Sequence, residues 1–335
     1  MTLRIDWFEL GQGNYMRQTH VVDSWTLGPT VWISGWVHGD EHFWVKVTKD
    51  FLRRVQVWEL ILLKWRIPLI LAWNEEALLL SQRWIDSWNK HDLNRVVDAV
   101  PDDEKEDSYT QNRWGEIKQL IDTMMPSAWL DLHSFSAPVG LPYAFSSIDG
   151  YKSIWKDLGI QNMAVNMGNA NKKSSGWVRK WSGVSDYVNA SSGHGFTFEA
   201  WPHKEPACLV ATYQALINFL VSQDMLEPKK VWLEVWKVIL HDHNDIVPIW
   251  WNTSSHVHIE SRHNFVWGFK YKWGHPQSFQ RYKKGDIIGY DIYTDGRKIE
   301  IKAQFDGHII LPKNPDVCTL GNEVFYYGKN MSEIV

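Results

Sequence analysis

In the first two-thirds of the chain, short apolar runs alternate with longer amphipathic stretches. The apolar runs predict buried strands, because a strand that is covered on both faces carries few polar residues. These runs cover residues 29–36, 67–74, 127–135, 161–168 and 194–201. The amphipathic stretches predict helices, and they cover residues 41–56, 111–125 and 205–223. Strands that alternate with helices indicate an α/β sheet flanked by helices on both faces.

Beyond residue 226 the pattern changes to short strand-like runs separated by turns. Gly-containing turns of this kind predict hairpins, and they lie at residues 283–286 (KKGD), 294–297 (TDGR) and 305–308 (FDGH). The sequence EPKK at 227–230 fits a linker. We therefore expect an α/β domain over residues 1–228 and a small all-β domain over residues 229–335.

Composition narrows the class of protein. The chain has 335 residues and a net charge of -4, so no basic excess points to a nucleic-acid partner. Its apolar segments are too short to span a membrane, and the N-terminal residues show no secretory signal pattern. The two cysteines, Cys208 and Cys318, form no CxxC pair and fit free thiols. We expect a soluble, cytoplasmic protein.

Potential metal ligands lie where predicted strands end. His38 and Glu41 follow the first run, and a spacing of three brings both side chains to one side of a helical turn. His133 lies near the end of the run at 127–135. In open α/β sheets, sites gather at the carboxyl ends of strands. Two His and one carboxylate with an open fourth position form a catalytic zinc set, although His38 and Glu41 alone also fit a polar loop.

Two further carboxylates lie near strand ends. Glu199 is placed to act as a general base beside a metal, although a carboxylate there also fits a capped strand end. Asp131 lies two residues before His133, hence on the same strand face, where it can orient the imidazole. The alternative for Asp131 is hydrogen bonding to backbone amides.

In chain order, the sequence carries HGDE (38–41), a lone Arg83, DLNR (92–95), DLHS (131–134) and the strand-end Glu199. This combination resembles the succinylglutamate desuccinylase and aspartoacylase family of the zinc carboxypeptidase superfamily, over most of residues 25–220. The resemblance implies a zinc-carboxypeptidase-like mixed sheet flanked by helices, followed by a small barrel-sandwich-like β domain.

The resemblance also implies roles for individual residues. It implies one Zn²⁺ per subunit in the 1–228 catalytic domain, held by His38, Glu41 and His133. It makes Glu199 the general base and acid, and Arg83 the group that polarises the scissile carbonyl. It assigns the α-carboxylate of the substrate to Asn94 and Arg95, and a guanidinium matches a carboxylate through two parallel hydrogen bonds.

Specificity is expected from residues 168–189, where Arg179 is the candidate partner for a second substrate carboxylate. The lysines of this segment also fit a solvated lid. Two features depart from the family pattern. Trp36 replaces a small residue before His38, and the sequence after Glu199 lacks a common glycine.

The sequence thus predicts a zinc-dependent amidohydrolase that removes the acyl group of a small N-acyl amino acid. A metallocarboxypeptidase that cuts a short peptide would use the same chemistry. A non-catalytic binding protein is the third alternative, which the bulky Trp36 favours and Glu199 disfavours. The identity of the acyl group and of the amino acid stays open, as does assembly into a homo-oligomer.

Overall fold

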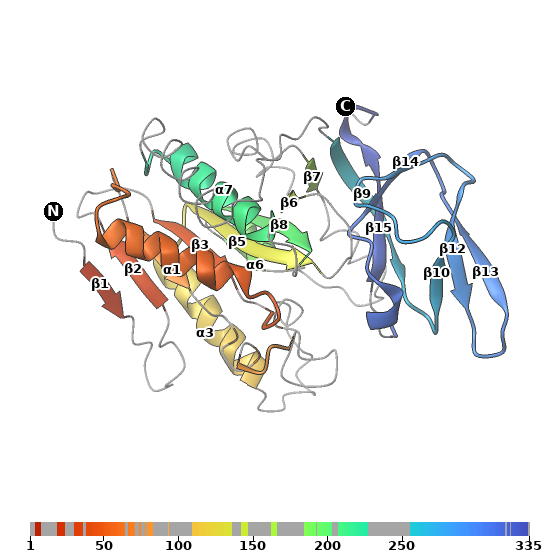
Figure 1. Ribbon diagram of the computed structural model, residues 1–335, viewed down its shortest axis with the longest axis horizontal. Coiled ribbons are helices and arrows are strands. Elements are labelled where there is room, and N and C mark those ends of the chain that lie inside the picture. Colours follow the sequence, from red (N-terminus) through yellow and green to blue (C-terminus); the bar gives the residue numbers. More distant parts are fainter. Residues whose placement is uncertain are drawn as a thin grey trace.

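The protein is a mixed β-sheet flanked by helices, with additional strands at its C-terminal end (Figure 1). The computed structural model describes residues 4–7, 19–23, 30–35, 38–63, 66–70, 74, 77, 79–82, 93, 109–135, 142–146, 162–165, 184–191, 193–202, 207–226, 255–318, 320–321 and 323–333. No helix within these ranges combines the length and apolar character needed to span a membrane.

Among the residues that the structure describes, the main sheet has twelve strands in the order β1-β2-β4-β3-β5-β8-β6-β7-β9-β15-β14-β11. Their bounds are, in chain order, β1 (Arg4–Trp7), β2 (Thr19–Asp23), β3 (Val31–Gly35), β4 (Arg66–Ile70), β5 (Ala128–Phe135), β6 (Tyr143–Ser146), β7 (Asn162–Val165), β8 (His194–Pro202), β9 (Ser255–Asn264), β11 (Arg281–Tyr282), β14 (Gly307–Ile310) and β15 (Glu323–Asn330). The central strands β4, β3, β5 and β8 run parallel, whereas β6 pairs antiparallel with β8. The predicted mixed sheet is therefore confirmed.

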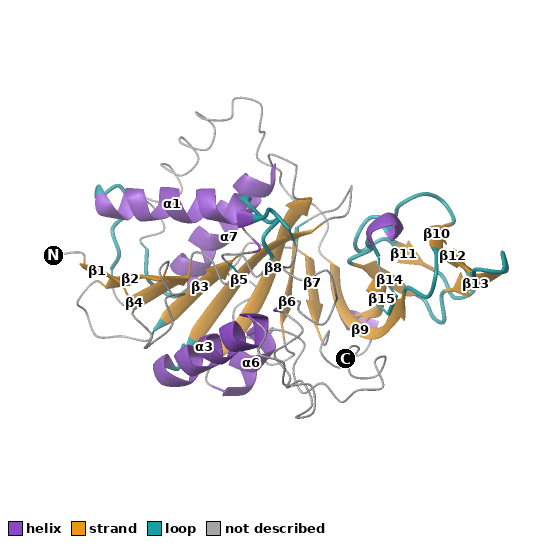
Figure 2. Cartoon of the chain, turned by 90° about the horizontal axis from the view of Figure 1, so that it is seen from below, coloured by secondary structure: helices purple, strands orange, loops and turns teal. Residues whose placement is uncertain are grey.

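Helices cover both faces of this sheet, as the sequence pattern predicted (Figure 2). On one face lie α1 (Phe43–Gln56) and α7 (Ala207–Ser222), which contact each other. On the other face lie α3 (Tyr109–Met124) and α6 (Val184–Ser191). Two short 3-10 helices, η4 (Pro315–Val317) and η5 (Met331–Glu333), flank β15.

The core explains why the central strands read as uninterrupted apolar runs. Every residue of β3 and β5 is buried, because helices pack on both sides of them. Ile33 and Leu130 belong to the core cluster that includes α1 and α7. Trp32 and Trp129 point to the other face, where their rings stack with centroids 5.1 Å apart, in the cluster that includes α3 and α6.

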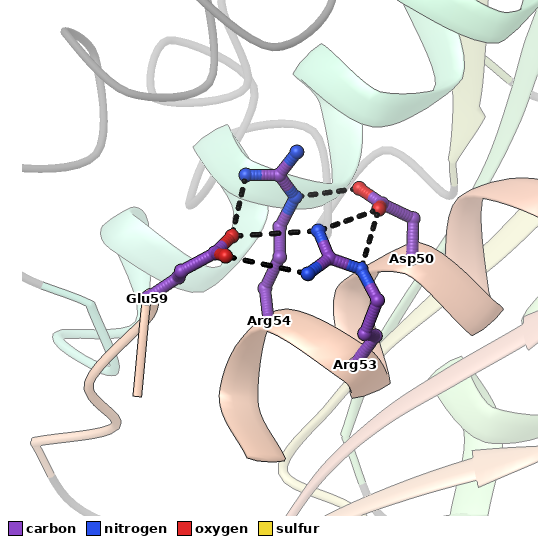
Figure 3. A network of polar contacts seen from close by, with 4 residues as sticks. All are labelled: Asp50, Arg53, Arg54 and Glu59. Carbon is purple, nitrogen blue, oxygen red and sulfur yellow. Dashed lines mark hydrogen bonds and ion pairs between the residues drawn. The ribbon is translucent and has the colours of Figure 1, made fainter. Parts of the chain in front are cut away.

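A polar network fixes the end of α1 (Figure 3). The Arg54 side chain is only 3% exposed, and it donates hydrogen bonds to Asp50 at 2.6 Å and to Glu59 at 3.1 Å. Its guanidinium also lies over the ring of Tyr213 on α7, 6.0 Å from the centroid. Arg53 bonds the same two carboxylates from a half-exposed position. The network therefore ties α1 to the loop that follows it and to α7.

The C-terminal strands form a small β-rich part, as predicted, and they also continue the main sheet (Figure 1). β9 pairs in parallel with β7 and antiparallel with β15. A second sheet contains β10 (Phe269–Tyr271), β12 (Ile287–Ile292) and β13 (Lys298–Lys302). The predicted boundary after residue 228 lies outside the described residues.

The predicted hairpin turns give different outcomes. TDGR joins the antiparallel strands β12 and β13, so this hairpin is confirmed, and Gly296 adopts a φ of 82° there. KKGD joins β11 to β12, and FDGH joins β13 to β14, and in each case the two strands belong to different sheets. The hairpin prediction is wrong for these two turns, because a turn sequence fixes a bend but not the strand that pairs next.

Candidate metal centre and active site

The candidate site lies where β3, β5 and β8 end. These strands are parallel neighbours, so their carboxyl ends meet at one edge of the sheet. β3 ends at Gly35, and an added Cβ there would lie 2.0 Å from the ring of Trp44 on α1. The absence of a side chain at Gly35 thus lets α1 pack closely over the strand that leads into His38 and Glu41.

His38, Glu41 and His133 converge on one another. One ligand-type atom from each side chain lies within 4.8 Å of the others, and all three residues are buried. Glu41 Oε1 is 2.8 Å from His38 Nδ1, and Glu41 Oε2 is 3.2 Å from His133 Nδ1. Within the part of the chain that the structure describes, no other group of three or more such side chains was found. The predicted convergence is confirmed.

Asp131 holds His133 from the side away from Glu41. Asp131 Oδ2 is 2.8 Å from His133 Nε2, and Asp131 Oδ1 accepts a hydrogen bond from Ser34 Oγ at 2.7 Å. Ser34 Oγ in turn accepts one from Trp129 Nε1 at 2.7 Å. The hypothesis that Asp131 contacts His133 is confirmed. This chain of bonds fixes the ring so that Nδ1 faces Glu41.

The charged forms of His133 and Glu41 stabilise each other in this cluster. Burial alone would lower the pKa of His133, but the charges of Asp131 and Glu41 and their hydrogen bonds raise it well above its usual value. Burial alone would raise the pKa of Glu41, but His133 and His38 lower it well below its usual value. Each buried charge is therefore compensated by its neighbours.

The three side chains fit a divalent metal ion. Two imidazoles and one carboxylate are the donor set of many catalytic zinc sites, and zinc accepts nitrogen and oxygen ligands. A ligating imidazole in such sites usually donates its other ring nitrogen to a carboxylate, as His133 can to Asp131. The atoms that face one another in this structure are thus the atoms that would face the ion.

Glu199 lies beside His133 on the neighbouring strand. The two residues are paired in the parallel register of β5 and β8, so their side chains share one face of the sheet. Glu199 is 9% exposed, and Tyr143 of β6 is its partner in the antiparallel register on its other side. A buried carboxylate at this position lies next to the cluster of His38, Glu41 and His133, and its role as a general base stays a prediction.

Several predicted site residues lie outside the described residues. They are Arg83, Asn94, Arg95 and Arg179, together with Trp36. Asn74 is described, and its Oδ1 accepts a hydrogen bond from the Ala77 amide. Tyr187, in the predicted specificity segment, donates to Asp122 of α3 at 2.6 Å and stabilises the packing of α6.

The sequence did not identify three residues that the structure places at the site. Ser34 is the buried hydrogen-bond partner of Asp131. The sequence indication for Ser34 was its position as a polar residue in an apolar run. Cys208 lies near Glu41 at the start of α7, and burial raises the pKa of its thiol to about 12. Tyr143 lies beside Glu199 only because β6 pairs with β8, which no local pattern predicts.

The sheet order, the helices on both faces and the strand-end cluster define a carboxypeptidase-like α/β fold. Residues 27–151 match the succinylglutamate desuccinylase/aspartoacylase catalytic domain. These residues are therefore similar to the catalytic domain of that family, and the predicted resemblance is confirmed over this range. A comparison with curated proteins found no match.

Solved structures share the fold. A succinylglutamate desuccinylase/aspartoacylase from Rhodobacter sphaeroides is 16% identical, with a TM-score of 0.65, covering 93% of this chain and 88% of that chain. The product-bound ectoine utilization protein EutE (DoeB) from Ruegeria pomeroyi is 14% identical, with a TM-score of 0.64 and the same coverage. A succinylglutamate desuccinylase from Vibrio parahaemolyticus is 16% identical, with a TM-score of 0.62, covering 94% of this chain and 86% of that chain. At these identities the similarity concerns the fold.

Proposed function

We propose that this protein is a zinc-dependent deacylase that hydrolyses the amide bond of an N-acyl amino acid. The observation that carries the proposal is the convergence of His38, Glu41 and His133 beside Glu199. The match to the family's catalytic domain supports the same conclusion. The substrate is a small molecule, and the free thiols of Cys208 and Cys318 support a reducing, cytoplasmic compartment.

One Zn²⁺ per subunit would be held by His38, Glu41 and His133. When bound, zinc supplies a Lewis acid that polarises a carbonyl and lowers the pKa of water. Asp131 keeps His133 in the orientation that presents Nδ1. Burial of all three side chains shields the ligand atoms from bulk solvent.

Glu199 performs the proton transfers of the proposed reaction. Its carboxylate takes a proton from the water that attacks the amide carbonyl and delivers it to the nitrogen of the departing amine. The products are a carboxylic acid and a free amino acid. For Arg83, Asn94, Arg95 and Arg179, the sequence resemblance is the support for contacts with the carbonyl and the substrate carboxylates.

The test is the Glu199→Gln variant, which keeps the size of the side chain and removes the base. With N-acetyl-L-aspartate and N-succinyl-L-glutamate as probes, we expect turnover to fall roughly 10²- to 10⁴-fold. Zinc content, measured by elemental analysis, stays at the wild-type value. Glu300→Gln is the control, because Glu300 is an exposed carboxylate on β13 paired with Lys302.

Two results would contradict the proposal. One is unchanged turnover in the Glu199→Gln variant. The other is a zinc-loaded wild-type protein that hydrolyses none of a panel of N-acyl amino acids. Hydrolysis of dipeptides instead of acyl amino acids would indicate a metallocarboxypeptidase, and zinc binding without any hydrolysis would indicate a binding protein.

A further inference from the structure

Tyr143 lies between Glu199 and the C-terminal part of the chain. It is the first residue of β6, it is fully buried, and it pairs with Glu199 across the antiparallel register. The side chains of paired residues point to the same face of a sheet, so the phenol stands beside the carboxylate. His133, Glu199 and Tyr143 therefore form a row across three adjacent strands.

Aromatic contacts hold the Tyr143 ring in place from several sides. Its centroid lies 5.1 Å from that of Phe145 and 5.8 Å from that of Phe135. Phe279, contributed by the C-terminal part, lies 5.5 Å away at a steep angle of 71°. Edge-to-face packing of this kind restricts the ring, so the position of its hydroxyl is determined by the fold.

The hydroxyl of Tyr143 is buried and makes no hydrogen bond of normal geometry with the described residues, although the hydroxyl of Ser278 lies near it. A buried hydroxyl without a well-formed hydrogen bond costs stability, so its presence calls for an explanation. Burial and the nearby Glu199 charge raise the pKa of Tyr143 well above its usual value, although the Ser278 hydroxyl acts in the opposite direction. The phenol therefore stays protonated and can donate a hydrogen bond.

We propose that Tyr143 is a positioning residue whose hydroxyl donates a hydrogen bond to the Glu199 carboxylate during the proton transfers. This inference rests on the proposed function, in which Glu199 is the base. A carboxylate that must accept and then release a proton needs a fixed orientation, and a donor on a rigid ring supplies it. Because Phe279 supports that ring, the C-terminal part of the chain contributes to the alignment of the base.

The test is the Tyr143→Phe variant, with N-acetyl-L-aspartate and N-succinyl-L-glutamate as probes. We expect kcat to fall about 10- to 100-fold with KM little changed, the range expected for one hydrogen bond to a charged group. The acidic limb of the kcat–pH profile shifts to higher pH, because the carboxylate loses a donor that favours its charged form. Zinc content is unchanged, and Tm stays the same or rises, since the lost hydroxyl made no well-formed hydrogen bond.

Tyr271→Phe is the matched control. Tyr271 is also buried and aromatic, but its hydroxyl donates to the carbonyl groups of Lys313 and Val324. We expect this variant to lower Tm and to leave kcat and its pH profile unchanged. A change in kcat and its pH profile without a fall in Tm indicates a positioning role, whereas a fall in Tm with unchanged kcat indicates a structural role.

The outcomes distinguish this inference from the proposed function. If Glu199→Gln is inactive while Tyr143→Phe keeps its kcat and pH profile, the positioning role is refuted and the deacylase remains. A Tm that falls in Tyr143→Phe also refutes it, because the hydroxyl would then be a structural partner. If Glu199→Gln retains turnover, or if wild-type protein hydrolyses no N-acyl amino acid, the proposed function fails and the positioning role fails with it.

Discussion

Asp131 uses both carboxylate oxygens, one on His133 and one on Ser34, so a single buried acid fixes one imidazole of the cluster. The Asp131→Asn variant keeps the shape but removes the negative charge that faces His133. We expect the affinity for zinc to fall roughly 10- to 100-fold. Competition with a chromogenic chelator measures this affinity directly.

The chain offers a matched control for this variant. Asp291 is also a buried acid, and its Oδ1 is 2.9 Å from Nε2 of His263 in the C-terminal strands. We expect Asp291→Asn to reduce stability without any change in zinc affinity. Equal zinc affinities for Asp131→Asn and wild type would show that Asp131 does not orient a ligand.

Because the charges of Glu41 and His133 compensate each other, we expect the folding stability of the metal-stripped protein to depend on pH. The pKa of His133 is raised above 6.5, so its contribution to stability is complete below this pH and is lost as the pH rises through the raised value. The pKa of Glu41 is lowered below 4.5, so its contribution is present above this pH and is lost as the pH falls through the lowered value. Both contributions are present together between pH 4.5 and 6.5.

The measurement is the difference in Tm between metal-stripped wild type and its His133→Gln variant, followed over pH. We expect the difference to be largest between pH 4.5 and 6.5 and to shrink at alkaline pH. Added zinc has the reverse dependence, because its ligands must be deprotonated, so the stabilisation by zinc grows with pH. A Tm difference that stays constant over the whole range would contradict the assignment of charges.

At the scale of elements, the end of α1 provides a test of buried against exposed ion pairs. The Arg54 side chain is 3% exposed and that of Arg53 is 50% exposed, yet both bond Asp50 and Glu59. Arg54→Ala removes buried hydrogen bonds and the packing of the side-chain stem on Tyr213, so we expect a loss of about 2 kcal/mol in unfolding free energy. Arg53→Ala should cost about 0.5 kcal/mol or less, because exposed pairs are screened by water.

Urea unfolding of Arg54→Ala and Arg53→Ala measures the two losses of unfolding free energy. Zinc binding should stay unchanged in each variant. The two arginines are neighbours in one helix turn with the same two partners, so helix propensity affects both substitutions alike. Equal losses in the two variants would mean that burial of the Arg54 guanidinium contributes nothing to the network.

The elements that the sequence predicted well are those whose burial is uniform. β3, β5 and β8 read as apolar runs, and α1 and α7 as long helices, because their environments follow the helix and strand periods. β6 has only four residues, and β15 begins with Glu323, which is buried against Lys313 at 2.6 Å. Neither gives a local signal, since one is too short and the other depends on a partner from another segment.

The same limit applies to the candidate site. Strand-end positions predicted His38, Glu41, His133 and Glu199, because parallel strands bring their carboxyl ends together. Tyr143 could not be predicted, since it meets Glu199 only through the pairing of β6 with β8. Ser34 was visible as a polar residue in a buried run, and its role depends on Asp131 of the neighbouring strand.

At the scale of the whole molecule, the main sheet runs through both predicted parts of the chain (Figure 1). β7 pairs with β9, so a strand from before the predicted boundary and the first described strand after it are neighbours. A third core cluster spans this junction and combines Phe135, Tyr143 and Phe145 with Phe279 and Tyr326. We propose that residues 1–228 and 229–335 are distinct in architecture but share one core at this junction.

This shared core predicts the behaviour of a truncated chain. A protein that ends after residue 228 would leave the edge of β7 unpaired and would uncover the aromatic residues around Tyr143. Exposed strand edges and apolar surfaces promote association, so we expect the fragment to aggregate, whereas the full chain unfolds in one transition. Size-exclusion chromatography and thermal unfolding measure both properties. A monomeric fragment that unfolds cooperatively would show that the α/β part folds independently, and the support of Tyr143 by Phe279 would then be dispensable for folding.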